Sequence, residues 1–334
     1  MWRPYLVPAL CLLLFTQCRN NTPAETVASL EEYPATVFVP TMEESFKPYR
    51  NVIYTSAFLL AWNGLKQEIK LPLKVSPGNY QLSLVNRSNT FRGALAENEY
   101  EKETSVNADV ISISTFFHKS LDLEMTLDSV LSGFTFSGKA VRAFGMPVYK
   151  NMLTTEIAVL YYKNDDEFII KLIPKDRQEE LILVKGAMRF NRLDALWREA
   201  SSDIIKGRRE MQDPGNTWKY TIQENDALII PVLHFNIETH YEDIEGQYIR
   251  TSAKDYEIAT AYQRTAFTLD EDGAIVESEA EVSAVAVDSS GPVVRSRSQH
   301  LFFDKPFLIV MKKADAANPY LMMKVENTEL MEKR

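Results

Sequence analysis

A stretch near the carboxyl end alternates between small side chains and larger or acidic ones, and this pattern restricts how the chain can fold. Every second residue is small: Ala274, Val276, Ser278, Ala280, Val282, Ala284 and Ala286. The residues between them include Glu277, Glu279 and Glu281. Because successive side chains of an extended chain face opposite sides, the segment can form a strand with a small buried face and an acidic face in water. Periodicity alone favours a plain half-buried strand.

The rest of the chain predicts an α+β fold in which strands dominate the C-terminal two-thirds. A largely buried helix is expected between Asn51 and Ile69, and an amphipathic helix between Leu193 and Ile205. Strands are expected at residues 80–84, 106–117, 134–144, 156–162, 167–173, 228–237, 265–269, 306–311 and 321–325. Pro231 interrupts one of these strands, which predicts a sheet edge or a bulge.

The first residues are typical of an export signal that ends in a lipidation site. Arg3 precedes an apolar run from Tyr5 to Phe15, which is too short to span a bilayer and fits the core of a signal peptide. Cys18 closes this run and a polar segment follows, an arrangement that resembles a bacterial lipoprotein signal. We therefore expect an exported lipoprotein anchored in a membrane, in the periplasm or at the cell surface. An ordinary cleaved signal with an incidental cysteine is the alternative.

The sequence predicts three segments: a signal peptide at residues 1–17, a lipidated N-terminus and tether at 18–45, and one domain at 46–334. The tether region is polar and contains Pro23, Pro34 and Pro40. Of the two cysteines, Cys11 would be removed with the signal, so no disulfide can stabilise the domain. A core of this size can support the fold alone, and we expect a monomer.

Charge and motif content argue against several classes of function. The net charge of −9 disfavours nucleic-acid binding, and the basic residues Lys206, Arg208 and Arg209 fit a solvated helix end. No nucleophile elbow, phosphate-binding loop or zinc motif is found. Residues 270–273 begin like a calcium loop, but the later bidentate glutamate is missing at the required offset. Metal-binding spacing is also absent among the four histidines, His118, His234, His240 and His300.

Segments between Asn51 and Asn327 resemble, in order, motifs of the serpin family. Residues 264–273 resemble the strand that leads into the hinge of the reactive loop, and residues 304–311 and 318–327 resemble the two closing strands. The other similar segments are residues 51–56, 106–126, 159–175 and 229–235. The resemblance implies a serpin-like α+β fold with a large mixed or antiparallel sheet, a second sheet, packed helices and a reactive-type loop at about residues 271–303.

The resemblance also implies a mechanism. In serpins a protease attacks the loop as a substrate, and the cleaved loop then inserts into the large sheet and traps the acylated protease. This chain would accordingly be a protease inhibitor that binds a target protease of the serine or cysteine class, not an enzyme, and would need no cofactor or metal. Thr55, Asn107 and Arg264 correspond to the gate of the insertion site. The hinge corresponds to Glu271, Gly273, Ala274, Val276, Ser278 and Ala280.

The position of the scissile bond follows from the loop length of the family. Counted from Glu271, that length implies cleavage near Val287–Asp288. Ala286 or Val287 would suit a protease with a small apolar pocket. Arg295 or Arg297 is the alternative and would attract trypsin-like proteases.

Several departures from the family pattern leave a second function open. Arg264 stands where the family has a buried histidine, Phe117 where it has a tryptophan, and Ser56 where it has a proline. The region between Ile69 and Asn107 is too short for several helices and one or two strands of the usual fold. A non-inhibitory serpin-like binding lipoprotein is therefore the alternative to an inhibitor.

Overall fold

The longest strand, β18 (Asp255–Asp270), runs through the large sheet and pairs with β16 on one side and β6 on the other. The computed structural model describes residues 26–96, 99–117, 119–131, 133–186, 188–276 and 298–334. In these residues the large sheet has nine strands. Besides β18 they are β1 (Ala28–Ser29), β4 (Lys74–Val75), β5 (Tyr100–Asn107), β6 (Val110–Phe117), β7 (Lys119–Asp122), β16 (Leu233–His240), β17 (Tyr248–Arg250) and β19 (Gly273–Val276).

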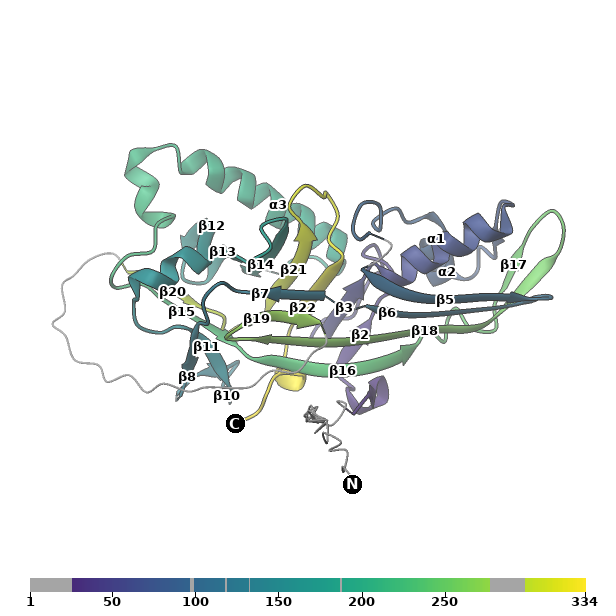
Figure 1. Cartoon of the computed structure of the whole chain (residues 1–334), viewed down its shortest axis with the longest axis horizontal. Coiled ribbons are helices and arrows are strands. Elements are labelled where there is room, and N and C mark those ends of the chain that lie inside the picture. Colours follow the sequence, from purple (N-terminus) through teal and green to yellow (C-terminus); the bar gives the residue numbers. More distant parts are fainter. Residues whose placement is uncertain (1–25, 97–98, 118, 132, 187, 277–297) are drawn as a thin grey trace, which may run out of the picture.

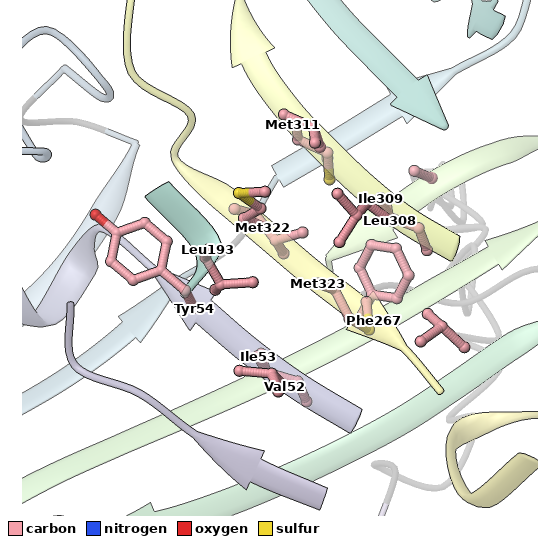
Figure 2. Close-up of a cluster of buried hydrophobic side chains, with 14 of the residues drawn as sticks. Val52, Ile53, Tyr54, Leu193, Phe267, Leu308, Ile309, Met311, Met322 and Met323 are labelled. Carbon is pink, nitrogen blue, oxygen red and sulfur yellow. The ribbon is translucent and has the colours of Figure 1, made fainter. Parts of the chain in front are cut away.

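A second sheet supplies much of the core. Its seven described strands follow the order β12-β13-β14-β21-β22-β3-β2. Figure 2 shows side chains of β3, β21 and β22 gathered with Phe267 of β18, so the core connects the two sheets. The strands are β2 (Thr36–Phe38), β3 (Asn51–Thr55), β12 (Ile157–Asn164), β13 (Glu167–Leu172), β14 (Glu179–Lys185), β21 (Phe307–Lys313) and β22 (Leu321–Val325).

A third, smaller sheet lies next to the end of the large sheet where β18 turns into β19. Its described strands are β8 (Asp128–Val130), β11 (Ala143–Met146), β15 (Ala227–Pro231) and β20 (His300–Phe302). A separate hairpin joins β9 (Thr135–Phe136) to β10 (Lys139–Ala140). The segment beyond β19 therefore leaves from the large sheet and re-enters the described chain just before β20 of the third sheet.

Helices cover the sheets at two places (Figure 1). Helix α1 (Ala57–Ile69) lies against β5 and β6, next to the short α2 (Tyr80–Arg87), and α3 (Leu193–Glu210) lies against β12. The 3₁₀ turns are η1 (Leu30–Glu32), η2 (Asn151–Glu156), η3 (Pro214–Lys219) and η4 (Thr328–Leu330). In the described part of the chain, no helix is long and apolar enough to cross a membrane.

The α+β class is confirmed, as are the helix at Leu193, the hairpin of β12 and β13, and the strands β21 and β22. Two elements near the N-terminus were predicted wrongly. Residues 51–55 form β3, not the start of a helix, because a strand buried on both faces has no period that distinguishes it from a buried helix. Residues 80–84 form part of α2, where the Asn79 side chain caps the helix by accepting a hydrogen bond from the Leu82 N–H.

Three other predicted strands are broken by turns. Residues 134–144 contain β9, β10 and the start of β11, because the chain reverses at Ser137 and Gly138, which both have positive φ. Residues 106–117 contain the tight turn of the β5–β6 hairpin, where Ala108 has a φ of +50°. Residues 228–237 are two strands in different sheets, because the chain passes from β15 to β16 at Val232. The proline therefore marks a change of sheet, not an edge or a bulge.

The folded domain begins earlier than the predicted boundary at residue 46. Strand β1 pairs with β16 and β2 pairs with β3. Phe38, Val39 and Met42 are buried in the core. Residues from Ala28 onward therefore belong to the domain, and the tether prediction can hold only for residues before it, most of which lie outside the described residues.

Candidate functional site

The predicted hinge is a strand of the large sheet. Strand β19 lies between β18 and β7 and pairs antiparallel with both (Figure 1). Ala274 is opposite Leu269 on one side and Leu121 on the other. All three side chains are buried, so the small inward-facing residue predicted at position 274 is found there. A larger side chain would have to displace two leucines from the core.

Gly273 is needed at the start of this strand. Its φ of +129° lies in a region that side chains disfavour, and a Cβ atom there would approach the Leu121 carbonyl oxygen to 2.3 Å. Only glycine lets the chain reverse at this point and still enter the space between β18 and β7, which we call the slot.

The turn before β19 is held by the segment that follows β7. The Leu127 N–H donates to the Glu271 carbonyl and the Leu123 N–H to the Asp272 carbonyl, each at 2.8 Å. The Ser129 hydroxyl donates to Glu271 Oε1 at 2.5 Å. Glu271 is only 5% exposed, so this hydroxyl satisfies a carboxylate that would be costly to bury alone. The hinge is thus anchored at its beginning.

Negative charge accumulates at the same turn. Burial raises the pKa of Asp270 from 3.8 to about 6. The Asp272 N–H opposes this shift by donating to Asp270, whereas the charges of Glu271, Asp272 and Glu332 add to it. The turn is therefore electrostatically strained at neutral pH.

Beyond β19 the large sheet is closed. Strand β18 pairs directly and in parallel with β6, from Glu257–Val110 to Thr265–Phe117. We call this pairing the seam. Any strand that continued from β19 along the same line would have to separate β18 from β6.

Two of the three predicted gate residues, Asn107 and Arg264, lie far apart along the large sheet, and the third, Thr55, belongs to the second sheet. Thr55 is fully buried at the end of β3. Arg264 lies on the outer face of the large sheet, where its guanidinium is 4.9 Å from the Phe116 ring centre and its Nε donates to Asn236 Oδ1 at 2.9 Å. Asn107 is exposed at the hairpin end of β5. Asn107 is opposite Val110, whereas Arg264 is opposite Phe116, which lies six residues farther along β6. Asn107 and Arg264 are therefore about 20 Å apart along the sheet.

The comparisons with known proteins give no match in sequence and a low similarity in structure. No family model matches the sequence, and no curated protein matches it. Serpin48 of the insect Tenebrio molitor is 13% identical with a TM-score of 0.35, and the native thermophilic serpin Tengpin is 10% identical with a TM-score of 0.35. Each match covers 65% of this chain and 55% of the other, so this chain spans about half the length of either serpin. Thyroxine-binding globulin in complex with thyroxine is 9% identical, with a TM-score of 0.39 and coverage of 87% and 74%.

The structure itself contains three features that the serpin resemblance of the sequence predicts. Within this chain, residues 264–273 form the end of β18 and its turn, as the serpin resemblance predicts for the strand that leads into the hinge. The two closing strands are β21 and β22, which are neighbours in the second sheet. Between α1 and β5 the described residues form only β4 and α2, in agreement with a serpin-like fold that is shortened near its N-terminus.

Sequence reasoning missed Gln263, a buried polar residue of the seam. Gln263 is 1% exposed; its side chain accepts a hydrogen bond from the Tyr241 hydroxyl at 3.0 Å and donates one to Thr265 Oγ1 at 3.2 Å. Across the seam it is opposite Thr115, which is 3% exposed. Strand alternation from the apolar Leu269 could have shown that position 263 faces inward and Arg264 outward.

Other predicted site residues lie outside the described residues. These are Cys18, Ser278, Ala280, Ala286, Val287, Asp288, Arg295 and Arg297. Val276 ends β19 opposite Lys119. In the described part of the chain, no group of three His, Cys, Asp or Glu side chains could hold a metal ion.

Proposed function

We propose that this protein is a serpin-like protease inhibitor that acts as a suicide substrate. A protease would cleave the segment between β19 and β20, and the freed part would then continue β19 as a strand of the large sheet. The position of β19 carries the proposal: residues 273–276 already lie between β18 and β7, and the alternating small residues follow directly in the sequence.

Insertion would exchange one ladder of hydrogen bonds for two. The seam between β18 and β6 is parallel, whereas β19 is antiparallel to both of its neighbours. A strand that continued beyond Val276 would separate the seam and pair on both sides. Antiparallel pairs are slightly more stable per residue than parallel pairs, and the added strand would also gain backbone partners. The closed sheet is therefore expected to be metastable, with energy released on insertion.

The side chains of the segment suit such a strand. Alternation from the buried Ala274 would direct Ser278 and Ala280 into the core and the intervening glutamates to the outer face. The outer face near the seam carries Arg264, which could accept an acidic neighbour. An inward glutamate would instead be a costly buried charge.

The sequence adds two further proposals. We place the scissile bond near Val287–Asp288, with Arg295 or Arg297 as the alternative, and the target is a serine or cysteine protease. Lipidation at Cys18 would anchor the exported domain to a membrane, in the periplasm or at the cell surface.

The test incubates the chain from residue 19 onward with an elastase-type and a trypsin-like protease. An inhibitor should form an adduct that survives denaturing gel electrophoresis, and mass spectrometry of the released C-terminal peptide should place the cut near Val287. The variant Ser278→Arg should be cleaved without adduct, because an arginine at an inward position cannot enter the core. Glu277→Arg is the matched control and should still form the adduct, because position 277 would face outward.

Clean cleavage of the unaltered chain, with no adduct, would contradict the inhibitor proposal. Equal adduct formation by Ser278→Arg and Glu277→Arg would contradict insertion along the β19 register.

One observation favours the alternative, a non-inhibitory serpin-like binding protein. A hollow of about 520 Å³ lies where β14 and β22 end and β21 begins, and its lining includes Phe46, Phe190 and the lysines Lys185, Lys305 and Lys324. The side chains of Lys185 and Lys324 are 4% and 5% exposed. Each lysine is already paired with a carboxylate: Lys185 with Asp304, Lys305 with Asp166 and Lys324 with Glu326. A small aromatic anion would stack on the aromatic rings and share these lysines with the carboxylates. Saturable fluorescence of an anilinonaphthalene sulfonate that Lys324→Met weakens, in a chain that forms no protease adduct, would support this function.

A further inference from the structure

The C-terminal tail, residues 326–334, meets two other segments in a closed ring of backbone hydrogen bonds. The Val232 N–H donates to the Arg142 carbonyl at 2.9 Å, the Arg142 N–H to the Glu332 carbonyl at 3.0 Å, and the Glu332 N–H to the Val232 carbonyl at 3.1 Å. Val232 is the residue at which the chain passes from the third sheet to the large sheet. The tail is thus fixed at a junction between sheets, beside the start of β11.

From this junction Arg142 reaches both the tail and the hinge. One guanidinium nitrogen binds the Glu332 carboxylate directly, and the other lies 4.0 Å from Glu271 Oε1. Glu271 belongs to the turn that leads into β19 and is 5% exposed. The tail and the hinge therefore share one cation, and the contact with the tail is the closer of the two.

Two electrostatic effects of Glu332 act in the same direction. Its carboxylate holds Arg142 away from Glu271, and its negative charge adds to that of the acidic turn, where it contributes to the raised pKa of Asp270. Like charges at short range repel each other, and a nearby opposite charge lowers the electrostatic energy of the group. A charged Glu332 is therefore expected to weaken the turn before β19, and Arg142 to strengthen it.

We propose that the C-terminal tail regulates how firmly the hinge is held in the large sheet, and that Arg142 is the positioning residue that links them. With Glu332 bound to Arg142 the turn is held less firmly than its hydrogen bonds and a close Arg142–Glu271 pair together would allow. Neutralising Glu332, or capturing the tail with a cationic partner surface, frees Arg142 to pair with Glu271 and holds β19 more firmly. The significance of this coupling for inhibition rests on the proposed function, whereas the coupling itself does not.

Hydrogen exchange of the backbone amides of residues 273–276 tests the coupling in the full chain without any protease. Glu332→Gln should slow exchange about twofold to fivefold, and Arg142→Gln should speed it by a similar factor, as for partly exposed charge pairs. The double variant should match Arg142→Gln, because Glu332 acts mainly through the arginine. Arg142→Lys should restore slow exchange in part. Glu326→Gln removes a tail charge that pairs with Lys324, and should leave exchange at 273–276 unchanged.

Two results would overturn the proposal. One is unchanged exchange in Glu332→Gln. The other is an equal effect of Glu332→Gln with and without Arg142, which would mean that the arginine transmits nothing. Because no protease is involved, either result would leave the inhibitor proposal to be judged by its own adduct test.

Discussion

At the scale of single residues, the hinge depends on Gly273 and the seam on Gln263. Gly273 combines a φ of +129° with a carbonyl oxygen where its Cβ would be. Gln263 connects Tyr241 to Thr265 beneath the sheet, opposite Thr115. Both residues occupy places where another side chain would either clash or leave a buried polar group without its partner.

Replacing Gly273 by alanine should displace β19 from its slot. The clash with the Leu121 carbonyl adds to the backbone strain, and together they should cost about 2–4 kcal/mol locally. Limited proteolysis and hydrogen exchange should show that residues 273–276 open. Gly138→Ala is the matched control: its φ is +81°, but a Cβ there would have no atom within 4 Å, so it tests strain alone. Equal effects of the two variants would show that the slot does not exclude a side chain.

Replacing Gln263 by leucine should destabilise the protein by about 1–3 kcal/mol, because the buried Tyr241 hydroxyl loses its acceptor. Chemical denaturation measures this cost. Adding Tyr241→Phe should recover part of it, since the orphaned hydroxyl is then gone. If the double variant is as unstable as the two single losses added together, the hydrogen bond is not the source of the effect.

At the scale of elements, the important unit is the turn between β18 and β19. The segment after β7 holds this turn with two kinds of hydrogen bond. Its backbone N–H groups donate to the carbonyl oxygens of Glu271 and Asp272, and its hydroxyl groups donate to the carboxylates of the same two residues. The same turn carries the acidic group Asp270, whose pKa burial raises to about 6. Good hydrogen bonding and unfavourable charge therefore coexist in one short connection, which makes its stability sensitive to pH.

Stability should fall as the pH rises through this region. The folded protein binds the Asp270 proton more tightly than the unfolded chain, whose carboxyl has the ordinary pKa of 3.8, so the free energy of unfolding decreases between about pH 4 and pH 6. Burial also raises the pKa of Glu44, to about 7, which extends the decline. Urea denaturation at pH 4.5–7.5 should show this slope, and Asp270→Asn should make it shallower below pH 6. An unchanged slope in that variant would mean that Asp270 is not strained.

At the scale of the whole molecule, the order of elements could be predicted because several motifs are local. The strand into the hinge, the turn at Asp270–Gly273 and the closing strands β21 and β22 each have a short sequence pattern. The burial of Ala274 followed from alternation alone. These features depend on side chains a few residues apart, which a single sequence displays.

Features that depend on tertiary context could not be predicted in the same way. Residues 80–84 alternate like a strand, but the Asn79 cap and contacts with α1 give a helix. Asn107 was assigned to the gate from the serpin resemblance, but the hairpin turn at Ala108 places it at the far end of the sheet. Residues 28–45 were predicted to be a tether because their strands, β1 and β2, are too short to show a period. β1 is fixed by pairing with β16, which is distant in the sequence, and β2 by pairing with β3. The role that we propose for the C-terminal tail has no sequence signal, since it depends on contacts with Arg142 and Val232, which are distant in the sequence.

The most direct test of insertion compares thermal unfolding of the intact chain with that of the chain cleaved once between β19 and β20. If the freed segment becomes a strand between β18 and β6, the cleaved protein should unfold at a clearly higher temperature, and amides of the seam should exchange more slowly. A cleaved chain that unfolds at the same or a lower temperature would contradict insertion, and would leave a serpin-like fold that binds without trapping.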